Sequence, residues 1–129
     1  TGPQKFKFPK AEKLKGKKNI EELFKNGSSL FLHPFLLKYL VAPQPAHRLL
    51  ISVPKKKLKR AVDRNIVKRR IREIYRLNKH LLYQEPTNHY HVGLVYQETK
   101  VLTYKEIEEK LIILLRRFGK KIEDENETH

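Results

Sequence analysis

The sequence predicts a single α+β domain with two layers, one central sheet and the element order α-β-β-β-α-β-α. Its 129 residues suffice for one compact domain. Short apolar runs are interspersed with longer segments in which apolar residues recur every three or four positions, as in strands and amphipathic helices. No run approaches about 18 consecutive apolar residues, so we expect no transmembrane helix. The chain has no cysteine, which excludes disulfides, cysteine zinc sites and thiol nucleophiles.

The first half of the chain predicts one helix followed by three strands. Asn19 and Glu22 form a capping-box pattern, and Gly27 is expected to end that helix. The next apolar runs are rich in aromatic and branched residues and are separated by His33-Pro34, which indicates two strands or one strand broken at the proline. Residues 43–47 contain two prolines and indicate a turn before another buried strand.

The second half predicts a long helix, a strand and a last helix. Residues 59–82 contain neither Gly nor Pro, and a loop is expected at 85–88. Thr103 and Glu106 form a capping box, and Gly119 is expected to end the last helix. In chain order, the expected elements are a helix at Lys18–Asn26, strands at Leu30–Leu32, Phe35–Ala42 and Arg48–Val53, a helix from Lys59 to about Leu82, a strand at Tyr90–Tyr96 and a helix from Thr103 to Gly119.

The net charge indicates a polyanionic partner. The chain has 29 Lys and Arg against 14 Asp and Glu, a formal charge of +15. Residues 55–80 contain twelve Lys or Arg but only Asp63 and Glu73 as acids, a net charge of +10. Residues 1–19 contain seven Lys against Glu12, a net charge of +6. Because such an excess causes self-repulsion in a compact domain, binding to a polyanion is its simplest explanation.

The long helix is expected to be amphipathic with a cationic polar face. At about 100° per residue, Val67, Ile71 and Ile74 form one narrow apolar stripe that faces the core. Like charges four residues apart destabilise an isolated helix, so an ordinary solvated face would intersperse acids among them. The opposite face carries Arg64, Lys68, Arg72 and Arg76 at intervals of four, with Asn65, Arg69 and Lys79 beside them.

RNA fits this helix better than the other partners of basic helices. A DNA recognition helix needs a second helix just before it, whereas a strand and three lysines precede this one. A membrane-surface helix would need a broader apolar face. A calmodulin-type target would leave the second basic block unexplained. The planar fork of arginine suits both phosphates and unpaired bases, which favours RNA.

The remaining residues give little support for protein-based catalysis or metal binding. A nuclease site would need clustered carboxylates or a histidine pair, and the only Asp residues are Asp63 and Asp124. His89 and His91 are two residues apart, but no third ligand accompanies them. We therefore expect no catalytic and no metal-binding residues. The other histidines in the body of the chain, which are dispersed and indicate turn or surface roles, are His33, His47 and His80.

The stretch Lys55–Glu73 resembles the signature of the bacterial ribonuclease P protein subunit. The pairs Arg64-Asn65, Lys68-Arg69 and Arg72-Glu73 match the pattern of that family in register. The resemblance extends from about residue 8 to residue 118, with a compatible order of elements. Three positions depart from the pattern: Ile66 replaces a second arginine, and Ile20 and Lys38 stand where the family often has aromatic residues.

The resemblance implies an RNA-binding subunit of a ribozyme. A large RNA would remove the 5′ leader of precursor tRNA with Mg²⁺ bound mainly by the RNA, and the protein would bind that RNA and the leader. It also implies a left-handed β-α-β crossover, a bacterial cytoplasmic location, no organic cofactor, no membrane and no obligate protein partner. The residues implied for the catalytic RNA are Lys55, Lys56, Arg60, Arg64, Asn65, Lys68, Arg69 and Arg72, and those implied for the leader cleft are Ile20, Phe24, Lys38 and Ser52.

The expected organisation is a basic N-terminal segment at 1–18, an RNA-binding domain at 19–119 and a polar, largely acidic tail at 120–129. Residues 1–3, which do not begin with methionine, are expected to be a remnant of cloning. Two alternative functions remain open. One is structural RNA binding in or near the ribosome, and the other, less consistent with the residues, is a protein-only endoribonuclease.

Overall fold

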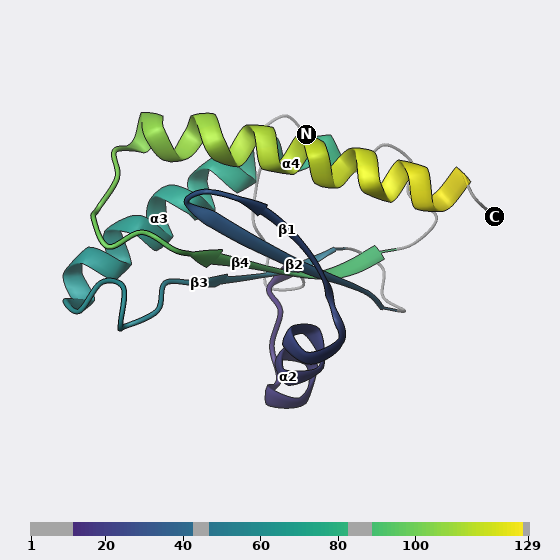
Figure 1. Cartoon of the computed structure of the whole chain (residues 1–129), viewed down its shortest axis with the longest axis horizontal. Coiled ribbons are helices and arrows are strands. Elements are labelled where there is room, and N and C mark those ends of the chain that lie inside the picture. The colour runs from purple at the N-terminus through teal and green to yellow at the C-terminus, as the bar shows by residue number, and fades with distance from the viewer. Residues whose placement is uncertain (1–11, 43–46, 83–88, 128–129) are drawn as a thin grey trace.

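Helices cover the two faces of the central sheet unequally (Figure 1). The computed structural model describes residues 12–42, 47–82 and 89–127, so all but the last residue of the turn predicted at 43–47 and the whole loop predicted at 85–88 lie outside the described residues. The predicted α+β order is confirmed. The elements are α2 (Lys17–Asn26), β1 (Ser28–Leu32), β2 (Phe35–Ala42), β3 (Arg48–Ser52), α3 (Ala61–Asn78), the short 3-10 helix η2 (Lys79–Leu82), β4 (His89–Tyr96) and α4 (Tyr104–Glu127).

The sheet has the strand order β1-β2-β4-β3, which places β1 and β3 at its two edges. β1 and β2 form an antiparallel hairpin that turns at His33-Pro34, and β2 pairs antiparallel with β4. β3 pairs with β4 in parallel, so α3 lies in a β-α-β crossover. The handedness of this crossover stays a prediction.

The main core lies between the sheet and the helices α3 and α4. The predicted stripe on the long helix is confirmed, because Val67, Ile71 and Ile74 are fully buried. Phe35 and Leu37 from β2 face these helices and are also fully buried. Full burial of each such side chain stabilises the fold by about 1.5–3 kcal/mol. The side chains of α4 that complete this core are Ile107, Leu111, Leu114, Leu115, Phe118 and Ile122.

The start of α2 differs from the predicted capping box. The helix begins at Lys17, after Gly16, whose φ of 94° is in the left-handed region that glycine adopts readily. Asn19 therefore lies inside the helix, where its side-chain amide donates to the carbonyl oxygen of Lys15 at 3.2 Å. The predicted stop at Gly27 is confirmed by the bond from its N–H to the carbonyl oxygen of Leu23, 2.8 Å long.

The last helix begins as predicted but does not end at Gly119. At its start, the backbone N–H of Glu106 donates to Thr103 Oγ1 at 3.1 Å, and the N–H of Thr103 donates to Glu106 Oε1 at 3.2 Å. At its end, α4 runs on to Glu127, because Ile122 packs in the core with 3% exposure. The predicted tail at 120–129 is therefore mostly helix and belongs to the packed domain.

A glycine at position 119 reflects close packing rather than a helix end. A Cβ atom built there would lie 2.6 Å from the carbonyl oxygen of Leu81, well inside contact distance. The final turns of α4 are also tied to the sheet, because the hydroxyl of Tyr90 donates to Glu125 Oε2 at 2.8 Å. Tertiary contacts thus override the local stop signal.

Candidate nucleic-acid interface

The turn between β3 and α3 presents two lysines to solvent. The backbone N–H groups of Lys57 and Leu58 both donate to the carbonyl oxygen of Pro54, at 3.0 and 3.2 Å. Leu58 is buried and anchors this turn in the core. Lys55 and Lys56 at its tip are exposed. The turn therefore places two cations directly before the cationic face of α3.

The predicted RNA-binding residues of α3 remain accessible at the surface. Within residues 12–42, 47–82 and 89–125, Arg60 is the one member of the set with an ion pair, at 3.5 Å from Asp63. Charges that are unpaired within the protein are available to phosphates. The exposed members of the set are Lys55, Lys56, Arg60, Asn65, Arg69 and Arg72, and the half-buried ones are Arg64 and Lys68.

Arg64 also has a structural role. Its Nη1 atom donates to the carbonyl oxygens of Leu58 and Lys59, at 2.9 and 2.7 Å. These bonds join the first turn of α3 to the preceding segment. Arg64, which is half-buried, therefore helps to position the turn that carries Lys55 and Lys56.

Three further cations of this region are engaged within the protein. Arg76, predicted on the cationic face, forms an ion pair of 2.5 Å with Glu73, and this bond lowers the pKa of the Glu73 carboxyl. Lys79, also predicted beside that face, lies 3.0 Å from Glu12, with both side chains less than one-seventh exposed. Arg70 donates to the carbonyl oxygen of Leu102 at 2.5 Å. The cationic face is therefore shorter than predicted and is limited to the part of α3 before residue 73.

The N-terminal basic segment meets α3 at the edge of the sheet. Lys13 bridges in parallel to Leu49 of β3, and the N–H of Leu14 donates to the carbonyl oxygen of Leu49 at 2.9 Å. Leu14 is buried, and its neighbours Lys13 and Lys15 are exposed. Residues 13 and 14 therefore pack against the sheet, directly before the domain that the sequence predicts from residue 19.

A groove of about 280 Å³ lies where these segments meet, and we call it the cationic groove. Its charged residues come from two elements that are distant in sequence, and its lining contains no carboxylate. Sequence reasoning assigned Lys68 and Arg72 to the interface but missed Lys13 and Lys15, although their alternation around an apolar residue is a strand signal. The groove is lined by Lys13, Leu14, Lys15, Leu49, Leu50, Ile51, Lys68 and Arg72.

Of the residues predicted for a leader cleft, Ile20 and Phe24 belong to α2, and Lys38 and Ser52 belong to strands β2 and β3 of the sheet that α2 partly covers. Ile20 and Phe24 are four residues apart on α2, and Phe24 remains 36% exposed. Lys38 is half-buried, and its Nζ donates to the carbonyl oxygen of Gly27 at 3.2 Å. Ser52 lies on β3, and β4 separates it from the strand of Lys38. The structure thus does not bring Ser52 against Lys38.

Gly93 allows α2 to approach the sheet closely. It pairs with Lys38 of β2 and with Leu50 of β3 in the centre of the sheet. A Cβ atom on Gly93 would lie 3.2 Å from Leu23 Cδ2 and 3.3 Å from Phe24 Cζ. An isolated glycine in a strand pattern indicates such an approach, although sequence reasoning did not single it out.

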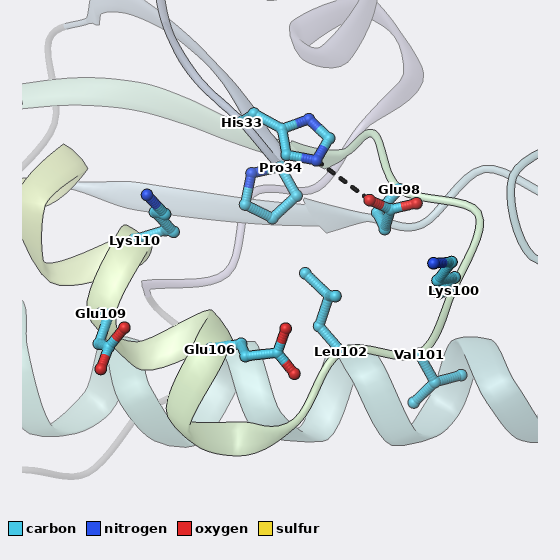
Figure 2. Close-up of a pocket in the computed structure, with 9 residues that line it drawn as sticks. All are labelled: His33, Pro34, Glu98, Lys100, Val101, Leu102, Glu106, Glu109 and Lys110. Atoms are coloured by element: carbon cyan, nitrogen blue, oxygen red, sulfur yellow. Dashed lines mark hydrogen bonds and ion pairs between the residues drawn. The ribbon is translucent and has the colours of Figure 1, made fainter.

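A larger cavity of about 570 Å³ lies beside the β1-β2 turn and the start of α4. Figure 2 shows that its lining mixes both signs of charge, with Glu98, Glu106 and Glu109 among its side chains. His33 Nε2 lies 3.1 Å from Glu98 Oε2. The backbone N–H of Thr99 and then His33 lower the pKa of the Glu98 carboxyl. Three carboxylates make this cavity a poor site for phosphates.

His47 is buried, and its predicted turn or surface role is wrong. Its Nδ1 accepts from the backbone N–H of Tyr90 at 3.1 Å, and its Nε2 lies 3.2 Å from the carbonyl oxygen of Leu82. These partners match the neutral ring, with the proton on Nε2. Burial lowers the pKa of His47 to about 4. The ring is therefore neutral at physiological pH and joins β3, η2 and β4.

The described residues contain neither a cluster that could hold a metal ion nor a helix that could span a membrane. No group of three or more His, Asp or Glu side chains in this part of the chain is arranged to hold a metal ion. None of the helices within it combines the length and the apolar character that crossing a membrane requires.

Comparison with known proteins identifies a family. The model of the Ribonuclease P family matches residues 8–119. The ribonuclease P protein component of Porphyromonas gingivalis is 41% identical over 87 residues, which cover 64% of this chain and 62% of that protein. The chain therefore spans less than two thirds of that relative. The protein component of Petrotoga mobilis is 32% identical over 114 residues, which cover 85% of this chain and 93% of that protein.

Solved structures show the same fold. The ribonuclease P protein of Thermotoga maritima superposes with a TM-score of 0.70 at 27% identity, over 82% of this chain and 96% of that one. The Staphylococcus aureus protein gives a TM-score of 0.70 at 29% identity, over 83% and 94%. The element order predicted from the sequence agrees with these structures.

Proposed function

Because this chain belongs to the ribonuclease P protein family, we propose that it is the protein subunit of a bacterial ribonuclease P. In this proposal it binds the catalytic RNA and the 5′ leader of precursor tRNA in the cytoplasm. The RNA carries the chemistry and most of the Mg²⁺, and the protein promotes removal of the leader. The relatives are named as protein components of this ribonucleoprotein.

The cationic groove carries the proposal. Lys13 and Lys15 from the N-terminal segment and Lys68 and Arg72 from α3 converge there without a carboxylate among the lining residues. Phosphates that bind to such a site release condensed counterions, which gives salt-dependent affinity. Together with Lys55, Lys56 and the exposed side of α3, the groove forms a continuous candidate surface for a folded RNA.

The face of the sheet that α2 partly covers offers features suited to leader binding. Phe24 is partly exposed above Gly93, so an unpaired base could stack on its ring. Such stacking tolerates any base and is worth about 1–3 kcal/mol, which suits leaders of varied sequence. The Lys38 ammonium lies nearby and offers a charge for the leader backbone.

The physical role of the protein is to reduce repulsion between two polyanions. Leader and catalytic RNA repel each other, and cations on two faces of one small domain lower that repulsion. Less Mg²⁺ is then needed to hold the substrate on the RNA. None of the described side chains is required to act on the scissile bond in this account.

The test is to add the purified chain to a bacterial ribonuclease P RNA and precursor tRNA at low Mg²⁺. We expect a gain in 5′-leader cleavage over the RNA alone, and none from the protein alone. No gain would contradict the proposal and favour a ribosomal role. Cleavage without added RNA would instead indicate a protein-only endoribonuclease.

A further inference from the structure

A second cationic surface lies on α4, away from the cationic groove. A depression of about 430 Å³ between α4 and β1 is lined by Leu30, Arg116, Arg117, Lys120, Lys121 and Asp124, and we call it the α4 groove. Its four cations are exposed, and Leu30 forms an apolar floor. Ile113, 43% exposed, lies one turn before Arg117 on the same side of the helix.

These four cations have no ion-pair partner among the side chains that the structure describes. Across residues 12–42, 47–82 and 89–125, the ion pairs found involve other side chains. Arg116 and Lys120, and likewise Arg117 and Lys121, stand four residues apart, a spacing at which like charges destabilise a helix. This spacing of like charges therefore destabilises α4 in the free protein.

The helix dipole does not explain the arrangement either. Cations are favoured in the last turn of a helix, next to its unsatisfied carbonyls. In α4 the cations end at Lys121, and the last turn has no basic residue. The residues that follow are the acidic Glu123, Asp124 and Glu125. Asp124 in the same groove is one negative charge against four positive ones, so a bound anion would offset the repulsion that remains.

The two cationic surfaces lie at opposite edges of the sheet. The α4 groove includes Leu30 of β1, and the cationic groove includes Leu49, Leu50 and Ile51 of β3. With the strand order β1-β2-β4-β3, two strands separate these edges. A single short RNA segment bound in one groove does not occupy the other.

We propose that the α4 groove binds the backbone of a second segment of the ribonuclease P RNA. This inference rests on the proposed function. The leader is expected on the α2 face of the sheet, whereas α4 covers the other face (Figure 1). A large folded RNA can reach both edges of a small domain. From Arg116 to Lys121 the helix rises about 7.5 Å, so the groove suits a short stretch of backbone.

Tethered cleavage tests the placement directly, because the chain has no cysteine of its own. An iron chelate that generates hydroxyl radicals is attached to Asp124→Cys, beside the α4 groove, and to Ala61→Cys, at the start of α3. Each full-length protein is bound to ribonuclease P RNA. We expect cuts from both probes, at different RNA segments. No cuts from position 124, or cuts at the same nucleotides as position 61, would overturn the inference and leave the proposed function standing.

A charge-matched pair of variants tests the contribution to binding. Arg117→Gln/Lys121→Gln should lower the log-log salt slope for ribonuclease P RNA by about two units. Lys100→Gln/Lys110→Gln removes the same charge elsewhere and should leave the slope unchanged. Equal slopes for the two variants would overturn the inference, as would a loss confined to precursor tRNA. If wild-type protein fails to bind ribonuclease P RNA at all, the proposed function itself fails.

Discussion

The cationic groove and the cavity of Figure 2 differ in size and in charge, and charge separates their roles. The cavity encloses about 570 Å³ but includes Glu98, Glu106 and Glu109. The groove encloses about 280 Å³, and its charged lining is Lys13, Lys15, Lys68 and Arg72. A polyanion is repelled by the first site and attracted by the second. For this chain, the sign of the lining charges indicates function better than cavity volume does.

Reversing charge in the groove should give the largest effect. Lys68→Glu/Arg72→Glu should weaken binding to ribonuclease P RNA by about 100-fold, because two charged hydrogen bonds are lost. It should also abolish the gain in leader cleavage at low Mg²⁺. Lys100→Glu/Lys110→Glu makes the same charge change at the cavity and should leave both properties near wild type. Equal losses in the two variants would mean that net charge alone matters.

Lowering the pH should destabilise the folded protein, because His47 is buried in its neutral form. Its pKa is about 4 in the folded protein against 6.5 ordinarily, so the unfolded state binds the proton more readily. Stability is then full above pH 6.5 and falls as the pH drops towards 4, by at most about 3 kcal/mol. Thermal melts between pH 7 and 4 should show this loss.

Two histidine variants separate this contribution from general acid effects. His47→Gln should reduce the pH dependence of the unfolding free energy, while His80→Gln, a change at an exposed ring, should preserve it. An unchanged pH profile in His47→Gln would show that another group causes the loss.

Changes on the α2 face of the sheet, where we propose that the leader binds, should affect leader binding without affecting binding at the cationic groove. Phe24→Ala should weaken binding of a single-stranded leader by about tenfold, because a stacking surface is lost. Affinity for ribonuclease P RNA without leader should not change. Phe31→Ala, at a phenylalanine that is 61% exposed on β1, is the matched control. Equal effects from both variants would indicate non-specific contact with aromatic side chains.

Replacing Arg64 should have a smaller effect, on both RNA binding and protein stability. Arg64→Ala should lower the log-log salt slope by about one unit. It should also reduce stability by about 1 kcal/mol, since two bonds to backbone carbonyls are lost. Arg69→Ala, at an exposed position of the same helix, should lower the slope with little change in stability. An unchanged slope for Arg64→Ala would exclude it as a phosphate contact.

Local patterns predicted most of the fold. The apolar stripe of Val67, Ile71 and Ile74 and the capping box at Thr103 depend on neighbours within one or two helical turns, and both are confirmed. The end of α4 depends on distant contacts. Ile122 packs in the core and Glu125 bonds to Tyr90, so the local signal of a glycine was overridden.

The candidate site was predictable only in part for the same reason. The charge and spacing of Lys68 and Arg72 are visible in the sequence. Their meeting with Lys13 and Lys15 requires the pairing of Lys13 with Leu49, which no local pattern specifies. The buried position of His47 likewise comes from partners more than thirty residues away.

The salt dependence of affinity for ribonuclease P RNA tests the central claim most directly. Dissociation constants for wild type, Lys68→Glu/Arg72→Glu and Lys100→Glu/Lys110→Glu are measured over a series of salt concentrations. We predict a slope at least two units shallower for the groove variant and an unchanged slope for the cavity variant. A groove variant with the wild-type slope would contradict the assignment of this groove to RNA.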